Sequence, residues 1–492
     1  MIAALLLIVP LLGCAAVLAL PQRYALRAGL VVTGLALAVA VVLAAVFDYS
    51  RSASWQLTLD VPWVPAMALR LQLGVDGVSL PLVLLTALLS TLCAIYCLRP
   101  GARPDRPRAF AALLSLLEVG MLGTFLARDL LLFFVFLELV LLPMYALIAG
   151  WGGAKRVAAA RMFILYTLLG SGLLLVGLLL IYAGAGTLDM AVLAARHGEG
   201  LSRSTQILAF LAVTGGLVVK APMWPLHSWL PAAHTEAPTV GSVLLAGVLL
   251  KMGTYGLVRI ALPILPEGAS VFAPVLGACG VAGIVYAGLA CLAQRDLKRL
   301  IAFSSVGHMG FVLLGIATLT PVGVNAALFG NIAHGLITGL LFFVVGGVKE
   351  RYGTTQIDKL GGGLLAVAPR LGSLLVLGAV ASLGVPGLAG FWGEMLALQA
   401  AYAPAAELSR GLYLVYFAIA GTGTVLTAAY FLVMVRRVAY GVAPASRRFP
   451  DLSRHELVAW APLVVAVLVA GLWPRTLLGL TDPAVRLLLR SG

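Results

Sequence analysis

Residues 217–256 read LVVKAPMWPLHSWLPAAHTEAPTVGSVLLAGVLLKMGTYG, and this stretch decides the fold. It joins two apolar runs, each long enough for the roughly 20 helical residues that cross a bilayer. The first run holds Pro222, Pro225 and Pro231 within ten residues. Each proline removes a backbone donor and clashes with the preceding helical turn, so this span must be broken. Non-helical backbone at membrane depth survives only where it is buried in protein or lines a wet cavity.

Composition places the whole chain in a bilayer. Of its 492 residues, 62% are hydrophobic and only 11% are charged, whereas about 25% of a soluble protein is charged. Apolar runs recur along the full length, so no segment is left for a separate soluble domain. The net charge of +14 does not indicate nucleic-acid binding, because the basic residues form short clusters between apolar runs.

The apolar runs predict an all-α integral membrane protein of about fourteen transmembrane helices. The twelfth is also broken, because the segment SLGVPGLAGFWGE combines Pro386 with four glycines. The predicted spans are 2–20, 26–47, 77–98, 109–127, 129–150, 162–183, 207–229, 239–260, 271–293, 300–318, 324–347, 371–400, 411–434 and 457–477.

Broken helices in the seventh and twelfth spans predict an internal repeat, with the transport pathway at the breaks. The spacing implies two five-helix repeats, spans 4–8 and 9–13. An odd number of spans per repeat makes the copies inverted in the membrane. The predicted units are N-terminal helices 1–3 (1–108), the first repeat (109–260), the second repeat (271–434) and a C-terminal region with helix 14 (435–492).

The positive charges predict the topology. Loops after odd-numbered spans carry about three times as many lysines and arginines as the others, which places the odd loops in the cytoplasm and both termini in the periplasm of a bacterial inner membrane. The opening MIAALLLIVPLLG has no preceding basic residue, so it is predicted to be a retained helix. Two of the loops after odd-numbered spans carry clusters of arginines. One cluster is Arg99, Arg103, Arg106 and Arg108, and the other is Arg436, Arg437, Arg447 and Arg448.

Five charged residues stand near predicted span centres. Inserting one charged side chain at the bilayer centre costs about 2.5 to 3.5 kcal/mol of free energy. Charges at these positions therefore indicate a functional or structural role. Burial disfavours the charged form and mutual pairing favours it, so making or breaking a pair moves a proton. We interpret them as stations of a proton relay; the alternatives are static ion pairs or a passive scaffold, which has no need of buried charge. They are Glu118, Glu138, Lys220, Lys251 and Glu394.

Glu138 lies one turn before Pro143, and Lys220 lies two residues before Pro222. A carboxylate opposite an amine at a helix break is a plausible switch, because freed backbone and water let the lysine change partners. Lys251 would be the second amine station. For Glu118 the sequence names no partner, so a static role stays open.

His308 and His334 lie between Lys251 and Glu394 in sequence. A histidine can carry protons near neutral pH, and a buried histidine held by a hydroxyl is equally ordinary, so both readings stay open. The groups expected to hold a water chain beside them are Ser304, Ser305, Asn331 and Thr338.

Little in the sequence predicts a cofactor or metal in this chain. His227 and His234 fall at or beyond a predicted span end and lack further ligands. The glycine-rich segments lack the strand and helix that flank a phosphate loop, and no flavin, haem or iron–sulfur motif is present. The cysteines have no metal-ligand spacing: Cys14, Cys93, Cys97, Cys279 and Cys291.

Four segments closely resemble the antiporter-like subunits of respiratory complex I, specifically the M-type, subunit 4 in mitochondria. They are FLELVLLPMYALIAGWGG, KAPMWPLHSWLPAAHTEAPTVGSVLLAGVLLKMGTYGLVR, QRDLKRLIAFSSVGHMGF and ERYGTTQIDKLGG. The second is long enough to be highly specific, and the resemblance covers about residues 110–400. Many relatives have aspartate at Ala232 and serine at Gly307, departures that remove no charged station.

The resemblance implies a fourteen-helix core in which Glu138 and Lys220 pair in one half-channel, Lys251 and the histidines bridge the centre, and Glu394 ends the second. An acid at 394, where sister subunits usually have lysine, favours the M-type. It implies a proton-translocating subunit of NADH:quinone oxidoreductase, with FMN, iron–sulfur clusters and quinone in partner subunits and sister antiporter-like subunits beside it. A sodium/proton antiporter subunit, or one of a hydrogenase- or ferredoxin-linked complex, remains the alternative.

Overall fold

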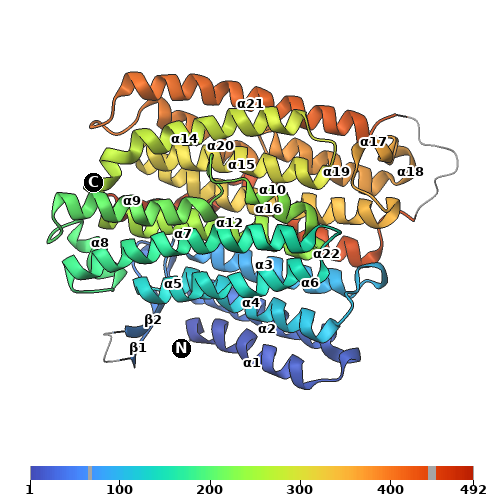
Figure 1. Cartoon of the computed structure of the whole chain (residues 1–492), viewed down its shortest axis with the longest axis horizontal. Helices are drawn as coiled ribbons and strands as arrows, with labels where there is room; N and C mark the ends of the chain where they lie inside the picture. The colour runs from blue at the N-terminus through green and yellow to red at the C-terminus, as the bar shows by residue number, and fades with distance from the viewer. Residues whose placement is uncertain (1, 65–68, 442–449, 491–492) are drawn as a thin grey trace.

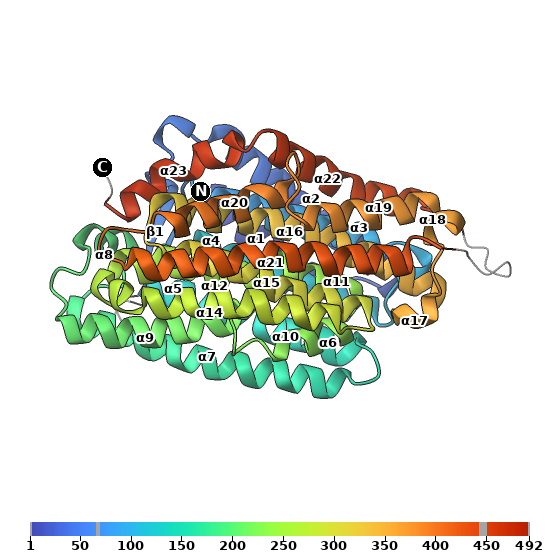
Figure 2. The same cartoon turned by 90° about the horizontal axis from the view of Figure 1, so that it is seen from above.

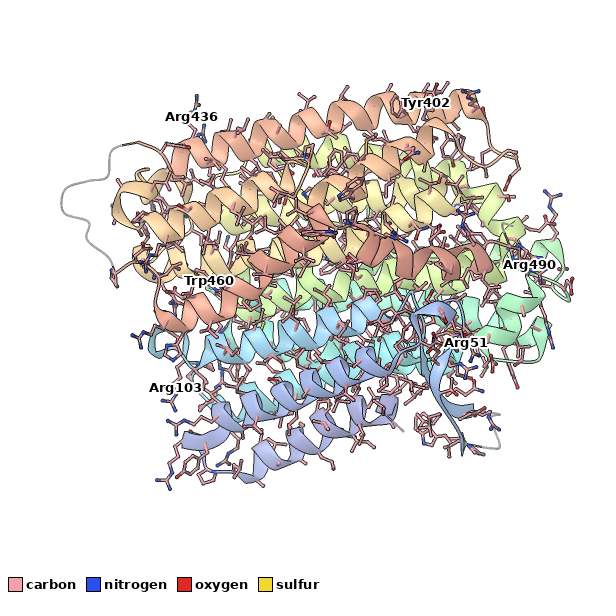
Figure 3. All side chains as sticks on the ribbon, turned by 180° about the vertical axis from the view of Figure 1, so that it is seen from behind. Arg51, Arg103, Tyr402, Arg436, Trp460 and Arg490 are labelled. Carbon is pink, nitrogen blue, oxygen red and sulfur yellow. The ribbon has the colours of Figure 1, made fainter. Side chains whose placement is uncertain are left out.

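The computed structural model describes residues 2–64, 69–441 and 450–490, so Arg447 and Arg448 lie outside the described residues. Long helices run side by side along one direction and form an elongated bundle (Figure 1). Arg103 and Arg436 lie at one end of this bundle, and Arg51 and Arg490 lie at the other (Figure 3). We call the end with Arg103 and Arg436 the basic end.

Twelve stretches of the described residues are long and apolar enough to cross a membrane, which confirms the multi-pass helical class. They are α1 (Ile2–Ala19), α2 (Gln22–Val46), α3 (Leu80–Cys97), α4 (Pro107–Leu126), α5 with α6 (Leu130–Trp151), α7 (Arg156–Ala185), α11 to α13 (Thr239–Ile264), α14 (Pro266–Leu292), α15 (Leu297–Ala317), α16 (Pro321–Tyr352), α21 (Arg410–Val438) and α22 (Arg454–Leu472).

Both predicted helix breaks are present. The first separates α9 (Arg203–Lys220) from α10 (Trp229–Glu236), and the second separates α19 (Pro369–Ser382) from α20 (Ala389–Tyr402). In the second break Gly384 and Gly387 have φ of +73° and +92°, a left-handed conformation that favours glycine. The two broken stretches fall outside the twelve, so a count of fourteen stays a prediction.

Two further spans are irregular, in addition to the two predicted breaks. α5 (Leu130–Leu139) stops before Val140 and α6 (Leu141–Trp151) continues. Pro143 explains this gap, because it cannot donate to the carbonyl one turn earlier.

The span Thr239–Ile264 contains two π-helical segments. It runs as α11 (Thr239–Leu244), η4 (Leu245–Leu249), α12 (Leu250–Gly256), η5 (Leu257–Ala261) and α13 (Leu262–Ile264). Such segments insert one residue into a helical turn and are frequent at functional sites. Pro263 follows the second segment and lacks the backbone donor that would reach the Arg259 carbonyl, whereas no proline marks the first segment.

The predicted long loop between the second and third spans forms a β-hairpin, a small departure from an all-α fold. β1 (Gln56–Val64) pairs antiparallel with β2 (Leu69–Val75), and Asp60 lies opposite Gln72. Leu57, Leu59 and Val61 alternate with polar residues, which is a strand pattern. The remaining short elements are η1 (Tyr49–Arg51), η3 (Pro100–Ala102), α8 (Met190–Arg196), α17 (Ile357–Leu360), α18 (Leu364–Val367) and α23 (Arg475–Leu488).

Ion pairs tie distant helices together at the ends of the bundle. At the basic end Arg99 after α3 pairs with Glu350 on α16 and Glu456 on α22, and Arg351 Nη1 lies 2.8 Å from Glu456 Oε1. At the other end Arg259 Nη2 lies 2.6 Å from Asp76 Oδ1. These pairs join N-terminal, central and C-terminal segments into one body.

Candidate functional site

Glu138 and Lys220 form a direct ion pair, as the sequence predicts. Lys220 Nζ lies 3.0 Å from Glu138 Oε1 and donates a second hydrogen bond of 3.0 Å to the Leu137 carbonyl. Lys220 is the last residue of α9, so its amine stands at the helix break. The Glu138 side chain is 21% exposed and the Lys220 side chain only 7%, so the carboxylate faces the outside of the bundle.

Local sequence signals set the position of Glu138. Asp129 caps α5 by accepting hydrogen bonds from the Leu131 and Leu132 amides. The gap at Val140 ends the helix at Leu139, one residue after Glu138. Glu138 therefore stands at the end of a short helix opposite another helix end, where side chains have more freedom than in a continuous span.

Lys251 is fully buried at the centre of the molecule. It lies in α12 between the two π-helical segments. Its Nζ lies 2.6 Å from His334 Nδ1 and also donates to the Ala246 carbonyl. Lys251 has no ion-pair partner among the residues that the structure describes, so its amine is held by neutral acceptors.

His334, His308 and Glu394 continue the line from Lys251. The rings of His334 and His308 have centroids 5.6 Å apart, and His308 Nδ1 lies 2.9 Å from Glu394 Oε1. All three side chains line one cavity of about 30 Å³. A cavity above about 10 to 15 Å³ has room for a water molecule, and this one has polar groups on its wall.

Glu394 stands beside the second helix break. A Cβ placed on Gly384 would lie 3.2 Å from Glu394 Oε2, so the left-handed turn approaches the carboxylate closely. The hydroxyl of Ser382, at the end of α19, lines the same cavity and has no hydrogen-bond partner among the described residues. The break therefore adds polar groups to the site.

The Glu138–Lys220 pair and Lys251 lie on neighbouring helices. Gly253 brings α12 against the end of α9, since a Cβ there would lie 2.6 Å from the Leu217 carbonyl oxygen. A cavity of about 20 Å³ lies beside Lys220, walled by α12 and by Thr167. One water fits in that volume.

Glu118 lies apart from this line, within α4. It is fully buried, and neither carboxylate oxygen has a hydrogen-bond partner among the described residues. The Ser90 hydroxyl of α3 lies beside it. The static ion-pair reading of Glu118 has no cation to support it within the described part of the chain.

Three residues of the site had no clear signal in the sequence. Ser171 on α7 donates to Glu138 Oε1, so the carboxylate is shared between a hydroxyl and an amine. His234 was expected at or beyond a span end, yet it is fully buried and stacks on Phe342 with centroids 4.6 Å apart. Lys298 is also buried, and its Nζ donates to the Ala237 carbonyl at 2.7 Å.

The hydroxyls and the amide expected to hold water beside the histidines are partly engaged in hydrogen bonds with the protein. Ser304 and Ser305 donate to the Ile301 carbonyl, and Thr338 donates to the His334 carbonyl. Asn331 accepts a hydrogen bond from Thr254 and leaves its own amide group free among the described residues.

Comparisons with known proteins identify the family. A family model described as NADH:quinone oxidoreductase/Mrp antiporter, transmembrane, matches residues 127–436. The chain is 42% identical over 489 residues to NAD(P)H-quinone oxidoreductase chain 4 1 of Synechococcus sp. (strain JA-3-3Ab), covering 96% of this chain and 89% of that protein. It is 38% identical over 482 residues to NADH-quinone oxidoreductase subunit M of Rhodobacter capsulatus, covering 96% and 91%.

Solved structures show the same fold. A chain of respiratory complex I from Thermus thermophilus superposes with a TM-score of 0.87 at 30% identity, covering 99% of this chain and 100% of that one. A chain of the Mrp complex from Dietzia sp. DQ12-45-1b gives a TM-score of 0.86 at 25% identity, covering 99% and 97%. The chain therefore belongs to the transmembrane family of NADH:quinone oxidoreductase and Mrp antiporter subunits.

Proposed function

We propose that this chain is a proton-translocating subunit of a membrane-bound NADH:quinone oxidoreductase, of the M-type. The observation that carries the proposal is the line of buried titratable groups from Glu138 to Glu394, in which direct contacts join Glu138 to Lys220, Lys251 to His334, and His308 to Glu394. Small cavities lie beside Lys220 and between the histidines and Glu394.

Proton movement follows from exchanging partners along this line. Protonation of Glu138 weakens its hold on Lys220, and the freed amine is then a proton donor for water in the adjoining cavity. Lys251 passes a proton to His334 Nδ1, and His334 releases its Nε2 proton to water in the cavity that both rings line. His308 takes up a proton at Nε2 and passes its Nδ1 proton to Glu394. Neutral histidines suit this role because each has one nitrogen to accept and another to donate.

We assign the two ends of the line to two repeats, 109–260 and 271–434, with 1–108 and 435–492 as flanking segments. One helix break lies in each proposed repeat, at Lys220 in the first and near Glu394 in the second. This arrangement supports alternating hydration of the two halves, because broken backbone tolerates water where a continuous helix excludes it.

We assign Glu118 to proton storage. A buried carboxylate without a cation is far cheaper to hold protonated than charged, so it can release a proton only when its surroundings change.

Redox chemistry is assigned to partner subunits, which would hold the FMN, the iron–sulfur clusters and the quinone. The described residues contain no group of three His, Cys, Asp or Glu side chains placed to hold a metal ion. All five cysteines are free thiols spread over α1, α3 and α14. The partners expected in the membrane arm include sister antiporter-like subunits and lipid.

We propose that the basic end faces the cytoplasm and that both termini are periplasmic, in a bacterial inner membrane. The charge asymmetry of the loops supports this orientation. Ala102 lies in η3 at the basic end, and Ser54 lies next to the hairpin at the other.

Cysteine labelling tests the orientation. With an impermeant thiol reagent on spheroplasts, Ser54→Cys is expected to react and Ala102→Cys to react only after the membrane is opened. The unaltered chain, with its own five thiols in helices, is the control. Labelling of Ala102→Cys in closed spheroplasts, with Ser54→Cys silent, would reverse the orientation and the direction of each half-channel.

Co-purification tests the assignment to an NADH-driven complex. The tagged chain is expected to bring down subunits that oxidise NADH, and the complex in liposomes is expected to acidify one compartment when NADH and quinone are supplied. Lys251→Met should stop that acidification while the complex stays assembled. Recovery with antiporter subunits only, and sodium/proton exchange without NADH oxidation, would establish the antiporter alternative instead.

A further inference from the structure

The span that carries Lys251 ends at a buried ion pair outside the line of titratable groups from Glu138 to Glu394. Arg259 lies in η5, and its Nη2 lies 2.6 Å from Asp76 Oδ1. The two side chains are only 3% and 2% exposed. Asp76 directly follows β2, and the hairpin lies at the end of the bundle opposite to α17 and α18 (Figure 2). The pair therefore joins the Lys251 span to the segment between the hairpin and α3.

Local hydrogen bonds hold the carboxylate of Asp76 in one place. Its Oδ1 accepts the backbone amides of Val78 and Ser79 at 3.1 and 3.0 Å. The backbone amide of Asp76 donates in turn to the Ser79 hydroxyl at 3.1 Å. Such side-chain bonds to nearby amides fix the backbone of a short turn. Asp76 is therefore a fixed point at the start of α3, against which the Lys251 span can be held.

The guanidinium of Arg259 is held from several sides. Its Cζ lies 4.4 Å from the centroid of the Trp55 ring, and its Nε donates to the Tyr255 hydroxyl at 3.3 Å. The Tyr255 hydroxyl donates to the Phe125 carbonyl of α4, also at 3.3 Å. A planar guanidinium presents its donors in a rigid fork, so these contacts fix its orientation. They also fix the rotation of the helix from which the side chain projects.

The backbone around Arg259 is less constrained than a regular helix. η5 is π-helical, with one more residue in its turn than an α-helix has. Pro263 lacks the donor that would reach the Arg259 carbonyl. Because an α-helix turns once in 3.6 residues, loss of the inserted residue would rotate one side of η5 against the other by about 100°. Side-chain contacts at Arg259 therefore help to decide the rotation of α12.

The rotation of α12 decides whether Lys251 reaches its neighbour. Lys251 Nζ lies 2.6 Å from His334 Nδ1, and Thr254 donates to Asn331 Oδ1 at 3.0 Å, both on α16. A helix turned by one residue would point Lys251 away from α16. Arg259 lies eight residues further along the chain, which is about 12 Å along a helix axis. It can therefore act on Lys251 only through the helix that joins them.

We propose that Asp76 and Arg259 are positioning residues for proton transfer, and that their ion pair holds α12 in the rotation at which Lys251 contacts His334. The inference rests on the proposed function, because it concerns the same transfer step. Neither residue takes up or releases the transferred proton. When the pair is lost, η5 relaxes, α12 turns, and the Lys251 amine leaves His334 Nδ1.

Asp76→Asn in the assembled complex tests this role. Asparagine keeps an oxygen that accepts the Val78 and Ser79 amides, so the start of α3 is retained and only the charge is lost. We expect NADH-driven acidification of liposomes to fall at least about tenfold, because moving a reacting group by about 1 Å can cost about a hundredfold in rate. Cryo-electron microscopy of the same complex should show the Lys251 amine separated from His334.

Two variants of Arg259 separate positioning from stability. Arg259→Lys keeps a cation beside Asp76 and should pump better than Arg259→Met. Asp76→Asn with Arg259→Met removes both charges and leaves no unpaired ion in the interior, so this double variant should assemble. It should still pump poorly, because nothing then holds the rotation of α12. The double variant also decides the question if a single variant fails to assemble.

An exposed ion pair at the same end supplies the control. Arg70 Nε also lies 2.6 Å from Asp60 Oδ1, but these side chains are 46% and 41% exposed on the hairpin. Asp60→Asn should leave both pumping and the contact between Lys251 and His334 unchanged.

Either of two results would overturn the proposal. One is an unchanged contact between Lys251 and His334 in the Asp76→Asn complex, or in the double variant where only that assembles. The other is normal pumping by the double variant, which would show that the pair only stabilises the fold. Failure of the proposed function would show instead as normal pumping by Lys251→Met, and the maps would still report the rotation of α12.

Discussion

Glu138→Gln is expected to remove most NADH-driven proton pumping while the complex remains assembled in the membrane. Glutamine keeps the size of the side chain and can still bond Ser171, but it cannot take up a proton or pair with the Lys220 ammonium. Lys220→Ala should have the same effect, because it removes the amine that changes partners. Pumping is measured as acidification of liposomes containing the purified complex, with quinone reduction followed in the same sample.

A double variant separates a proton station from a static ion pair. Removing one partner of a buried pair destabilises a protein by about 3 to 5 kcal/mol, whereas replacing both with apolar groups is often neutral. Glu138→Gln with Lys220→Met should therefore restore any lost stability and still not pump. Recovered pumping in the double variant would show that the pair only holds α5 to α9.

An acid outside the line serves as control for Glu138. Glu267 at the start of α14 is half exposed and lies 3.4 Å from Arg203. Glu267→Gln also removes one carboxylate and one ion pair, yet it should pump normally because an exposed pair of this kind contributes little. Equal loss in both variants would show a general sensitivity to charge and not a pathway.

Glu394→Gln is expected to abolish most pumping and to slow coupled electron transfer. Glu394 is the acid of α20, it contacts His308, and it stands where the glycine-rich break admits polar groups to the cavity. A group that ends the line must hold a proton and then release it, which a carboxylate can do and an amide cannot. Glu407, exposed in the loop after α20, supplies the control variant Glu407→Gln.

Glu394→Lys should retain more pumping than Glu394→Gln. An amine restores a titratable group at this position, as in the sister subunits that the chain resembles, and His308 can accept a hydrogen bond from it in one tautomer. Proton pumping and quinone reduction are measured together on assembled complexes. Wild-type pumping by the glutamine variant would refute the assignment of Glu394, and a lysine variant no better than glutamine would show that a titratable group alone is insufficient there.

The sequence by itself determined the membrane class, both proline and glycine breaks, and which residues carry buried charge. These features are local. The effect of an apolar run, of a proline in a helix or of a charge in hydrocarbon depends on the residue and its neighbours in sequence, and not on which helices pack together. The pairing of Glu138 with Lys220 was implied by the resemblance to the antiporter-like subunits, because a place beside a proline does not by itself bring two residues of different helices together. The strand pattern of Leu57 to Val61 is equally local, because alternation of apolar and polar residues marks a strand wherever it occurs.

Only the tertiary structure decided which helices meet and in what register. Contact of Lys251 with His334 joins residues 83 positions apart, and contact of Ser171 with Glu138 depends on how α7 lies against α5. The burial of His234 depends likewise on packing against neighbouring helices. So does the first π-helical segment, Leu245–Leu249, because it contains no proline and no charge. Helix periodicity tells which face a side chain occupies, but the rotation and sliding of one apolar helix against another are set by the shapes of all their neighbours.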